Sequence, residues 1–224
     1  MKLIIGDYNY STWSMRPWLY VHKHGLPVEV KRYDLFSEDL RQVLSERFSN
    51  DKVPVLLDGT TEVWDSLAIL EYLGERFPDS KPWPEDTEAR AVARSVSAEM
   101  HSSFGALRNE APMNLRRQFP GYRLSEEALA DVGRVQAVWR YCREGFANDG
   151  PWLFGEFTIA DVMYAPVVMR FRSIPVNLDD DAAGYCSTVE SDPSVREWIR
   201  CGLEETHRVD EDELDWPSKP VTEI

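Results

Sequence analysis

Asp65 and Ser66 stand at a point in the sequence where they could bind an anion. Behind them, apolar residues recur at spacings of three and four and predict a helix with one buried face; these are Leu67, Leu70, Leu73 and Phe77. Asp65 and Ser66 therefore begin this helix, where free backbone N–H groups and the positive end of the helix dipole favour negative charge. A purely structural interpretation also exists, because Asp is among the best N-cap residues.

The segment before this helix predicts a short β-hairpin. Val53 and Pro54 open an apolar run, Asp58 and Gly59 are typical of a two-residue hairpin turn, and the segment 62–64 can return as the partner strand. Because Pro54 has no N–H to donate to a sheet, it belongs at a strand start or an edge. The backbone before it is therefore free for another ligand, and a peptide-like molecule is one such ligand.

The stretch from Val53 to Leu73 closely resembles the glutathione-binding half of the cytosolic glutathione transferases. In that family the Pro is cis, and the acidic residue and the Ser hold the γ-glutamyl end of glutathione. Two further segments carry the same resemblance, YSTWSMRPW at residues 10–18 and FTIADVMYAP at residues 157–166. In this order and at these distances the motifs are specific and span most of the chain. The resemblance implies glutathione as cosubstrate, a small electrophile as second substrate, and a homodimer.

Strands and helices alternate in the first third of the chain, which predicts an α/β fold. The expected elements before the hairpin are a strand at 2–5, a helix that Ser14 or a neighbour caps and Gly25 ends, a strand at 28–33 and a helix at 37–48. Through the resemblance, this order corresponds to a thioredoxin-like, glutathione-binding domain over residues 1–79.

The rest of the chain predicts an all-α helical bundle. Pro82 and Pro84 mark a linker at residues 80–86, because proline breaks helices. Beyond it, helical apolar spacing dominates residues 87–216, beginning with one long stripe from Ala89 to Leu107, and residues 217–224 form a tail. The acidic segment Glu204–Trp216 is interpreted as solvated.

The composition excludes several classes of partner. The formal net charge of −14 argues against nucleic acid and anionic membranes, because binding them requires clustered Lys and Arg. The sequence has neither an apolar run long enough to span a membrane nor a signal-peptide pattern, so we expect a cytoplasmic protein. The 3 cysteines have no CxxC spacing and the 4 histidines no HExxH spacing. Neither a disulfide scaffold nor a metal site is therefore predicted.

The resemblance requires a group that stabilises the thiolate of glutathione. A free thiol has a pKa of about 8.5, and lowering it by two units requires roughly 2.7 kcal/mol. One hydrogen bond to a charged acceptor contributes about 1.5–3 kcal/mol and a helix N-terminus about 0.3–1 kcal/mol, so a single hydroxyl at the start of the first helix suffices. The hydroxyl candidates in this loop are Tyr8, Tyr10, Ser11, Thr12 and Ser14.

Ser11 is the predicted catalytic hydroxyl, and Tyr10 is its rival. The segment resembles the Ser-type classes, zeta among them, in which a Ser stands five residues before a helix Arg, and counting back from Arg16 gives Ser11. Tyr-type classes place a Tyr near the same point, so one residue of register separates the two candidates. A Ser before a helix is also commonly only an N-cap. Trp13 stands where zeta members carry a Cys, which argues against mixed-disulfide chemistry, and Arg16 is either a surface cation or a residue that orients the loop.

The resemblance also implies how glutathione would be bound. Asp65 would meet the amino group of the γ-glutamyl end, and Ser66 with nearby N–H groups would take its carboxylate. Val53 would pair through its backbone with the cysteinyl part, and Lys52 would reach the glycyl carboxylate. The second substrate is expected against the first long helix of the bundle, where four residues share one side, although each also fits a core or surface role; they are Met100, His101, Phe104 and Arg108.

The predicted function is that of a Ser-type glutathione transferase. The alternatives are a glutathione-dependent cis-trans isomerase resembling maleylacetoacetate isomerase, a peroxidase that uses bound glutathione, and a binding or scaffold protein without turnover. Asp161 is assigned to folding instead, because Thr158 and Asp161 have the spacing of a capping box in which Asp replaces the usual Glu or Gln.

Overall fold

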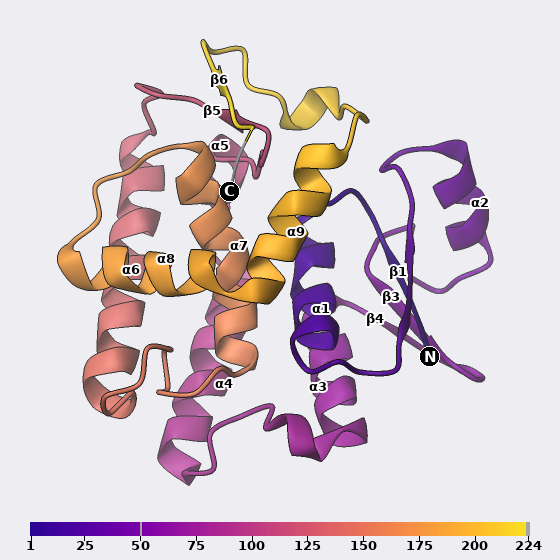
Figure 1. Ribbon diagram of the computed structural model, residues 1–224, viewed down its shortest axis with the longest axis horizontal. Helices are drawn as coiled ribbons and strands as arrows, with labels where there is room; N and C mark the ends of the chain where they lie inside the picture. Colours follow the sequence, from indigo (N-terminus) through magenta and orange to yellow (C-terminus); the bar gives the residue numbers. More distant parts are fainter. Residues whose placement is uncertain (50, 223–224) are drawn as a thin grey trace.

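In the computed structural model, which describes residues 1–49 and 51–222, the N-terminal part of the chain is a four-stranded sheet (Figure 1). The strands are β1 (Lys2–Ile5), β2 (Glu29–Arg32), β3 (Val55–Asp58) and β4 (Thr61–Trp64). Their order is β2-β1-β3-β4, with β1 and β2 parallel and the other neighbours antiparallel. The sheet is therefore mixed, and β1 lies in its interior.

Side-chain alternation along β1 determines which helices cover which face of the sheet. The covering helices are α1 (Thr12–Lys23), α2 (Glu38–Ser45) and α3 (Ser66–Arg76). Leu3 and Ile5 enter the main core with residues of α1 and α3, whereas Ile4 joins a smaller cluster with Leu40 of α2. Figure 1 shows the result: α2 lies alone on the outer face, and α1 and α3 lie between the sheet and the remaining helices.

The remaining helices form a bundle around α7. They are α4 (Thr87–Ser102), α5 (Gly105–Glu110), α6 (Glu126–Phe146), α7 (Ile159–Ser173), α8 (Asp180–Ser191) and α9 (Pro193–Glu204). Nearly every residue of α7 is buried, and α1 packs directly against it. In the described part of the chain, every helix is too short or too polar to cross a bilayer.

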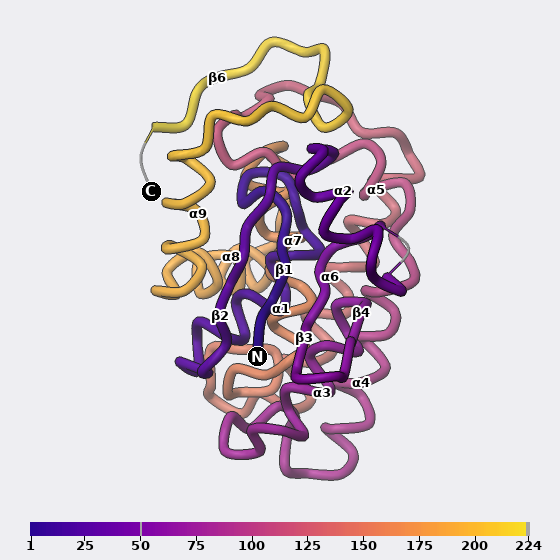
Figure 2. The backbone as a smooth tube through the Cα atoms, turned by 90° about the vertical axis from the view of Figure 1, so that its right-hand side faces the viewer, coloured from indigo at the N-terminus to yellow at the C-terminus, as the bar shows by residue number. Residues whose placement is uncertain are grey.

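Beyond α9 the chain runs back across the molecule (Figure 2). A short 3-10 turn, η2 (Asp210–Asp212), is followed by β6 (Lys219–Pro220), which pairs with β5 (Arg117–Gln118). A second 3-10 turn, η1 (Pro78–Ser80), follows α3. Residues 219–220 are thus attached to the bundle by backbone pairing.

The predicted fold class, a thioredoxin-like domain followed by a helical bundle, is confirmed, although several boundaries differ. Helix α2 ends at Ser45 instead of Phe48, and the cap of α1, expected at Ser14 or a neighbour, is Ser11. The apolar stripe expected as one helix up to Leu107 is divided, because Phe104 adopts a left-handed conformation with φ of 63°. Helix α8 and the β5–β6 pair were not expected, and the division of the chain at residues 80–86 stays a prediction.

Asp161 has more partners than a capping box requires. Its Oδ2 accepts a hydrogen bond from the Thr158 N–H at 2.9 Å, which completes the box, while Oδ1 accepts from the Leu153 N–H at 3.0 Å and the Tyr185 hydroxyl at 3.1 Å. The residue is 1% exposed, and burial raises the pKa of Asp161 to about 6. One carboxylate thereby joins the loop before α7, α7 itself and α8.

We expect Asp161→Ala to lower the free energy of unfolding by about 3–7 kcal/mol. Loss of the cap accounts for about 1 kcal/mol, and each buried donor left unpaired adds about 1–3 kcal/mol. The control is Asp86→Ala, which removes a single capping hydrogen bond at α4, to the Ala89 N–H at 2.8 Å, and should cost only about 1 kcal/mol. Equal losses in the two variants, measured by chemical denaturation, would contradict this account.

The loss in Asp161→Ala should also depend on pH. The pKa of Asp161 in the folded protein, about 6, lies above the ordinary value, so the group contributes stability that is fully present near pH 4 and is lost as the pH rises through 6. Denaturation at pH 5 should therefore show a loss that exceeds the loss at pH 8 by about 1 kcal/mol.

Candidate functional site

Ser11 lies at the N-terminus of α1 with its hydroxyl in a short hydrogen-bonded chain. Its Oγ accepts from the Ser14 N–H at 3.3 Å and donates to Ser14 Oγ at 2.8 Å, and Ser14 Oγ also accepts from the Gly6 N–H at 3.0 Å. Ser11 is 7% exposed, whereas Ser14 is completely buried. Of the two hydroxyls, only that of Ser11 can meet a ligand from outside.

Tyr10, the rival candidate, has its hydroxyl engaged elsewhere. It donates to Glu213 Oε1 at 2.6 Å and accepts from Arg116 Nη2 at 2.7 Å, and the residue is only 4% exposed. Burial, followed by the hydrogen bond to Glu213, raises the pKa of Tyr10. The Tyr10 hydroxyl therefore points toward the part of the chain after α9 that carries Glu213.

The residues predicted to bind glutathione lie in two segments, Lys52 and Val53 before β3 and Asp65 and Ser66 at the start of α3. The Val53–Pro54 bond is cis, and the sheet register begins only at Val55, so the backbone of Val53 takes no part in the ladder. Ser66 is 1% exposed, and its Oγ has no hydrogen-bond partner among the described residues. An unpaired buried hydroxyl at a helix N-terminus is energetically unfavourable unless a ligand forms a hydrogen bond with it. Lys52 is exposed, as a solvated cation would be.

Asp65 is the N-cap of α3 and also contacts a second helix. Its Oδ1 accepts from the Leu67 N–H at 2.9 Å, and its Oδ2 lies 2.6 Å from His101 Nε2 at the end of α4. The His101 ring packs edge-on against Trp13 of α1, with centroids 5.4 Å apart. His101 thereby connects the N-terminal end of α1, where Ser11 lies, with the N-terminal end of α3.

Trp13 is also in contact with two cations. The guanidinium carbon of Arg16 lies 4.5 Å from the ring centroid, and that of Arg108 lies 4.8 Å from it. These distances are typical of cation–π contacts. Of the four residues predicted to line the second-substrate site, His101 and Arg108 lie at this cluster, whereas Met100 and Phe104 are buried in the core. Met100 and Phe104 therefore have the core role that their residue types favour, and the place of the second substrate stays a prediction.

Arg16 is a buried orienting residue. It is 1% exposed and donates to the Met163 carbonyl at 3.2 Å and to the Thr12 carbonyl at 3.3 Å, so the surface interpretation is wrong. Burial, followed by the neighbouring charges of Arg108 and Arg170, lowers the pKa of Arg16 well below its ordinary value. The side chain fixes the first turn of α1 to α7.

Arg170 of α7 was missed by sequence reasoning, because a cation within an otherwise apolar helix carries no motif. It is 8% exposed, donates to the Ala111 carbonyl and, at 3.1 Å, to the Arg108 carbonyl, and lies 3.4 Å from Thr12 Oγ1. Burial lowers the pKa of Arg170 to about 10. Within residues 1–49 and 51–222, none of the guanidiniums of Arg16, Arg108 and Arg170 forms an ion pair with a carboxylate. Positive charge is therefore concentrated where these three side chains lie near one another, beside the first turn of α1.

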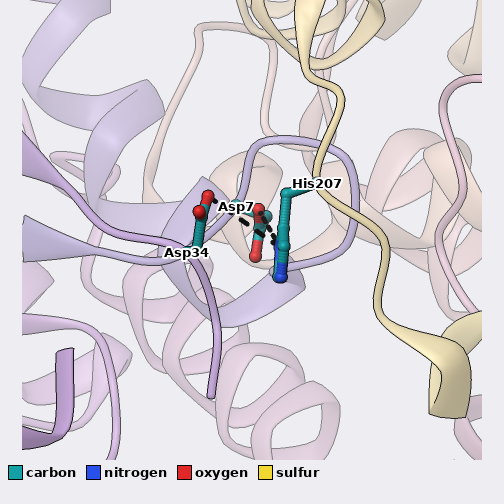
Figure 3. A group of neighbouring side chains, drawn as sticks. All are labelled: Asp7, Asp34 and His207. Carbon is teal, nitrogen blue, oxygen red and sulfur yellow. Dashed lines mark hydrogen bonds and ion pairs between the residues drawn. The ribbon is translucent and has the colours of Figure 1, made fainter. Parts of the chain in front are cut away.

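Asp7, Asp34 and His207 form the one grouping in the described part of the chain with the spacing of metal ligands, since one ligand atom from each lies within 4.8 Å of the others (Figure 3). Arg32 already forms ion pairs with both Asp7 and Asp34, and His207 Nδ1 lies 3.0 Å from Asp7 Oδ1. Because a guanidinium supplies the positive charge here, we interpret the group as an ion-pair network. It borders a surface hollow of about 370 Å³.

The cysteines lie outside the site. All three are free, and Cys142 and Cys186 are buried. Burial raises the pKa of each of these two thiols to about 12 and that of Cys201 to about 11. Such thiols carry almost no thiolate at neutral pH, so a hydroxyl remains the best candidate for thiol activation.

Comparisons with known proteins match both parts of the chain to one family. Residues 6–81 match the family model described as glutathione S-transferase, N-terminal domain, and residues 98–201 match the corresponding C-terminal domain. The chain is 33% identical to a probable maleylacetoacetate isomerase of Caenorhabditis elegans over 80% of this chain and 82% of that protein. It is 28% identical to glutathione S-transferase 1 of Dianthus caryophyllus, over 75% and 76% of the two chains.

Solved structures show the same fold. A glutathione transferase homologue from Burkholderia with bound glutathione superimposes with a TM-score of 0.68 at 22% identity, covering 92% of this chain and 98% of that one. A maleyl pyruvate isomerase, described as a bacterial zeta-class enzyme, superimposes with a TM-score of 0.67 at 18% identity, covering 92% and 100%. With both domain models matched in order along the sequence, the chain belongs to the glutathione S-transferase family.

Proposed function

We propose that this protein is a glutathione transferase in which the Ser11 hydroxyl stabilises the glutathione thiolate for attack on a small electrophile. The observation that carries the proposal is the unpaired, buried Ser66 hydroxyl at the N-terminus of α3, beside a strand that follows a cis proline. The carboxylate of the γ-glutamyl end would accept a hydrogen bond from this hydroxyl. The family of the chain, and the neighbour whose structure holds glutathione, support glutathione as the ligand.

Ser11 is favoured over Tyr10 because of where the two hydroxyl protons point. Tyr10 donates to Glu213, whereas Ser11 donates to Ser14 Oγ, a neutral acceptor that a thiolate can replace by rotation of the hydroxyl. Ser14 can then donate to Ser11 Oγ, which strengthens the hydrogen bond from Ser11 to sulfur. The charges of the buried Arg16 and the partly buried Arg108 favour an anion at the same place.

Asp65 would receive the amino group of glutathione in a site that His101 already shares. Asp65 Oδ2 lies 2.6 Å from His101, so the ammonium group would join an existing pair. Val53 would offer its backbone to the cysteinyl part, and the exposed Lys52 would pair with the glycyl carboxylate. A lone exposed pair contributes little, so Lys52 should be the least important of these contacts.

A cis-trans isomerase is the second candidate, favoured by the 33% identity to the probable maleylacetoacetate isomerase. Both reactions begin with the same thiolate. They differ in product, because the isomerase regenerates free glutathione whereas the transferase consumes it. Following thiol loss alongside the ultraviolet spectrum of the substrate separates these two activities, and absence of both with glutathione bound indicates a scaffold protein.

We also propose a homodimer in the cytoplasm. Phe48 is 79% exposed and Trp64 is 42% exposed, and the two rings lie 5.2 Å apart on the outer surface. Exposed aromatic pairs of this kind are enriched at protein interfaces. The three free cysteines suit a reducing compartment.

Ser11→Ala should raise the thiol pKa of bound glutathione by about 1–2 units, since one hydrogen bond to a charged acceptor is lost. The measurement is the thiolate ultraviolet difference spectrum across pH. Ser37→Ala is the matched control, because Ser37 caps α2 through the Leu40 N–H in the same way but lies away from the site. The role would pass to Tyr10 if the thiol pKa in Ser11→Ala equalled that in the wild-type protein while the thiol pKa in Tyr10→Phe rose to the value of free glutathione.

Ser66→Ala should weaken glutathione binding about 10- to 100-fold, because a hydrogen bond to the ligand carboxylate is removed. The unliganded variant should be as stable as the wild type or slightly more so, since the hydroxyl has no partner there. Calorimetric titration and thermal unfolding measure the two effects. Unchanged affinity, or a clear loss of stability without ligand, would show that the hydroxyl has a structural role instead.

Phe48→Ser should weaken self-association at least tenfold in sedimentation equilibrium, because it removes an exposed aromatic anchor. Tyr141→Ser, at an exposed aromatic of α6, provides a comparison elsewhere on the surface. A wild-type protein that sediments as a monomer at all concentrations would contradict the dimer.

A further inference from the structure

The loop that carries Ser11 is held from behind by the end of the chain. Residues 205–213, here called the C-terminal segment, leave α9 and cross the end of the molecule at which α1 begins (Figure 1). Contacts join this segment to three successive residues of the loop: Tyr8, Asn9 and Tyr10. The interpretation of the acidic segment as solvated is therefore wrong for the two glutamates that make these contacts.

Glu205 binds the loop through its backbone. Its two carboxylate oxygens accept from the Tyr8 N–H at 3.0 Å and from the Asn9 N–H at 2.9 Å. Its side chain is 9% exposed, and Arg32 Nε donates to it at 2.7 Å. Without this carboxylate, two partly buried N–H groups would lose their partners, which proteins avoid. Glu205 thus satisfies the backbone of the loop.

Glu213 binds the loop through the residue next to Ser11. Its Oε1 accepts from the Tyr10 hydroxyl at 2.6 Å and from Asn114 Nδ2 at 3.0 Å. Arg116 donates to the same Tyr10 hydroxyl at 2.7 Å and to the backbone carbonyls of Glu205 and His207, at 2.6 and 2.7 Å. The Tyr10 side chain is therefore clamped between a carboxylate and a guanidinium, both outside the N-terminal sheet.

The contacts that hold the Tyr10 side chain affect Ser11 because the two residues are adjacent in the chain. The Thr12 N–H donates to the Tyr10 carbonyl at 3.0 Å, and the Ser11 N–H donates to the Asp7 carbonyl at 3.0 Å. A shift of the Tyr10 ring would therefore be passed to the backbone on both sides of Ser11. Displacements of about 1 Å in a reacting group cost on the order of 100-fold in rate.

We propose that Glu213 is a positioning residue that, through Tyr10, fixes the Ser11 hydroxyl in the place where it stabilises the glutathione thiolate. The inference rests on the proposed role of Ser11. It makes the acidic C-terminal segment part of the machinery of thiol activation, although none of its side chains touches the sulfur.

The sign of the effect separates positioning from direct electrostatics. Removal of a negative charge near the site would by itself favour the thiolate and lower the thiol pKa. Displacement of the Ser11 hydroxyl acts in the opposite direction and raises the thiol pKa. The direction of the shift in a Glu213 variant therefore reports which of the two effects dominates.

The test is the thiol pKa of bound glutathione in Glu213→Ala, measured by ultraviolet difference spectroscopy and by the pH profile of kcat/KM with a standard aromatic chloride as electrophile. We expect a rise of about one unit. Accordingly, kcat/KM should fall about tenfold at pH 6 and return to the wild-type value above pH 9, where the thiolate forms unaided, and KM for glutathione should change less than twofold. A general structural defect would lower activity equally at every pH.

Two further variants complete the design. Asp210→Ala is the matched control, because Asp210 lies in the same segment with an 85% exposed side chain that pairs with Arg208, and it should behave as wild type. In a Tyr10→Phe background, Glu213→Ala should cause no additional shift of the thiol pKa, since the connection is already cut. Should Glu213→Ala fail to fold, Glu213→Gln, which keeps an acceptor for Tyr10, should raise the pKa by about half a unit.

The outcomes are distinguishable. If the wild-type protein binds glutathione without lowering its thiol pKa, the proposed function itself is contradicted. A wild type with a low thiol pKa and Glu213 variants with an unchanged or lower one overturns only the positioning role. An additive effect in the double variant likewise overturns it, because Glu213 would then act independently of Tyr10.

Discussion

The connection between β1 and α1 is the constraint on which the candidate site depends. A loop of only six residues, Gly6–Ser11, must reverse the chain and start α1 with its polar groups satisfied. The hydrogen bond from the Gly6 N–H to Ser14 Oγ fastens the end of the strand to the first turn of the helix. Helix α9 packs against this loop, because a Cβ atom at Gly202 would lie 3.4 Å from the Asn9 nitrogen, in van der Waals contact, and only 2.6 Å from Leu115 Cδ1. The site is therefore shaped by both ends of the chain.

Positive charge gathers at one place in a chain that is acidic overall. The chain has a net charge of −14, yet the side chains of Arg16, Arg108 and Arg170 gather beside the start of α1. Their donors are satisfied by main-chain carbonyls, several of them in the last turns of α4 and α5, where the helix dipole favours cations. The carbonyls satisfy the hydrogen bonds, whereas carboxylates act on these three charges only from beyond the distance of an ion pair. The positive charges of these guanidiniums would stabilise an anion bound at Ser11.

The sequence predicts those parts of the site that depend on local patterns. The hairpin with Asp58 and Gly59, the cap at Asp65 and the box at Thr158 each involve residues within four positions of one another, so turn chemistry and helical periodicity reveal them. Glu205 and Glu213 were missed because their partners lie about 200 residues away in the chain and neither belongs to a periodic pattern. Helical spacing also could not separate Met100 from His101, since adjacent positions on α4 differ only in what packs against them.

The structural and catalytic interpretations of Ser11 are compatible because they use different parts of one hydroxyl. As an N-cap, Ser11 Oγ accepts a hydrogen bond from the Ser14 N–H through a lone pair. Stabilising a thiolate requires its proton, which is free to rotate from Ser14 Oγ toward a ligand. The cap therefore holds the oxygen in place while the proton remains available. In this loop, the interaction that begins the helix is also the one that orients the donor.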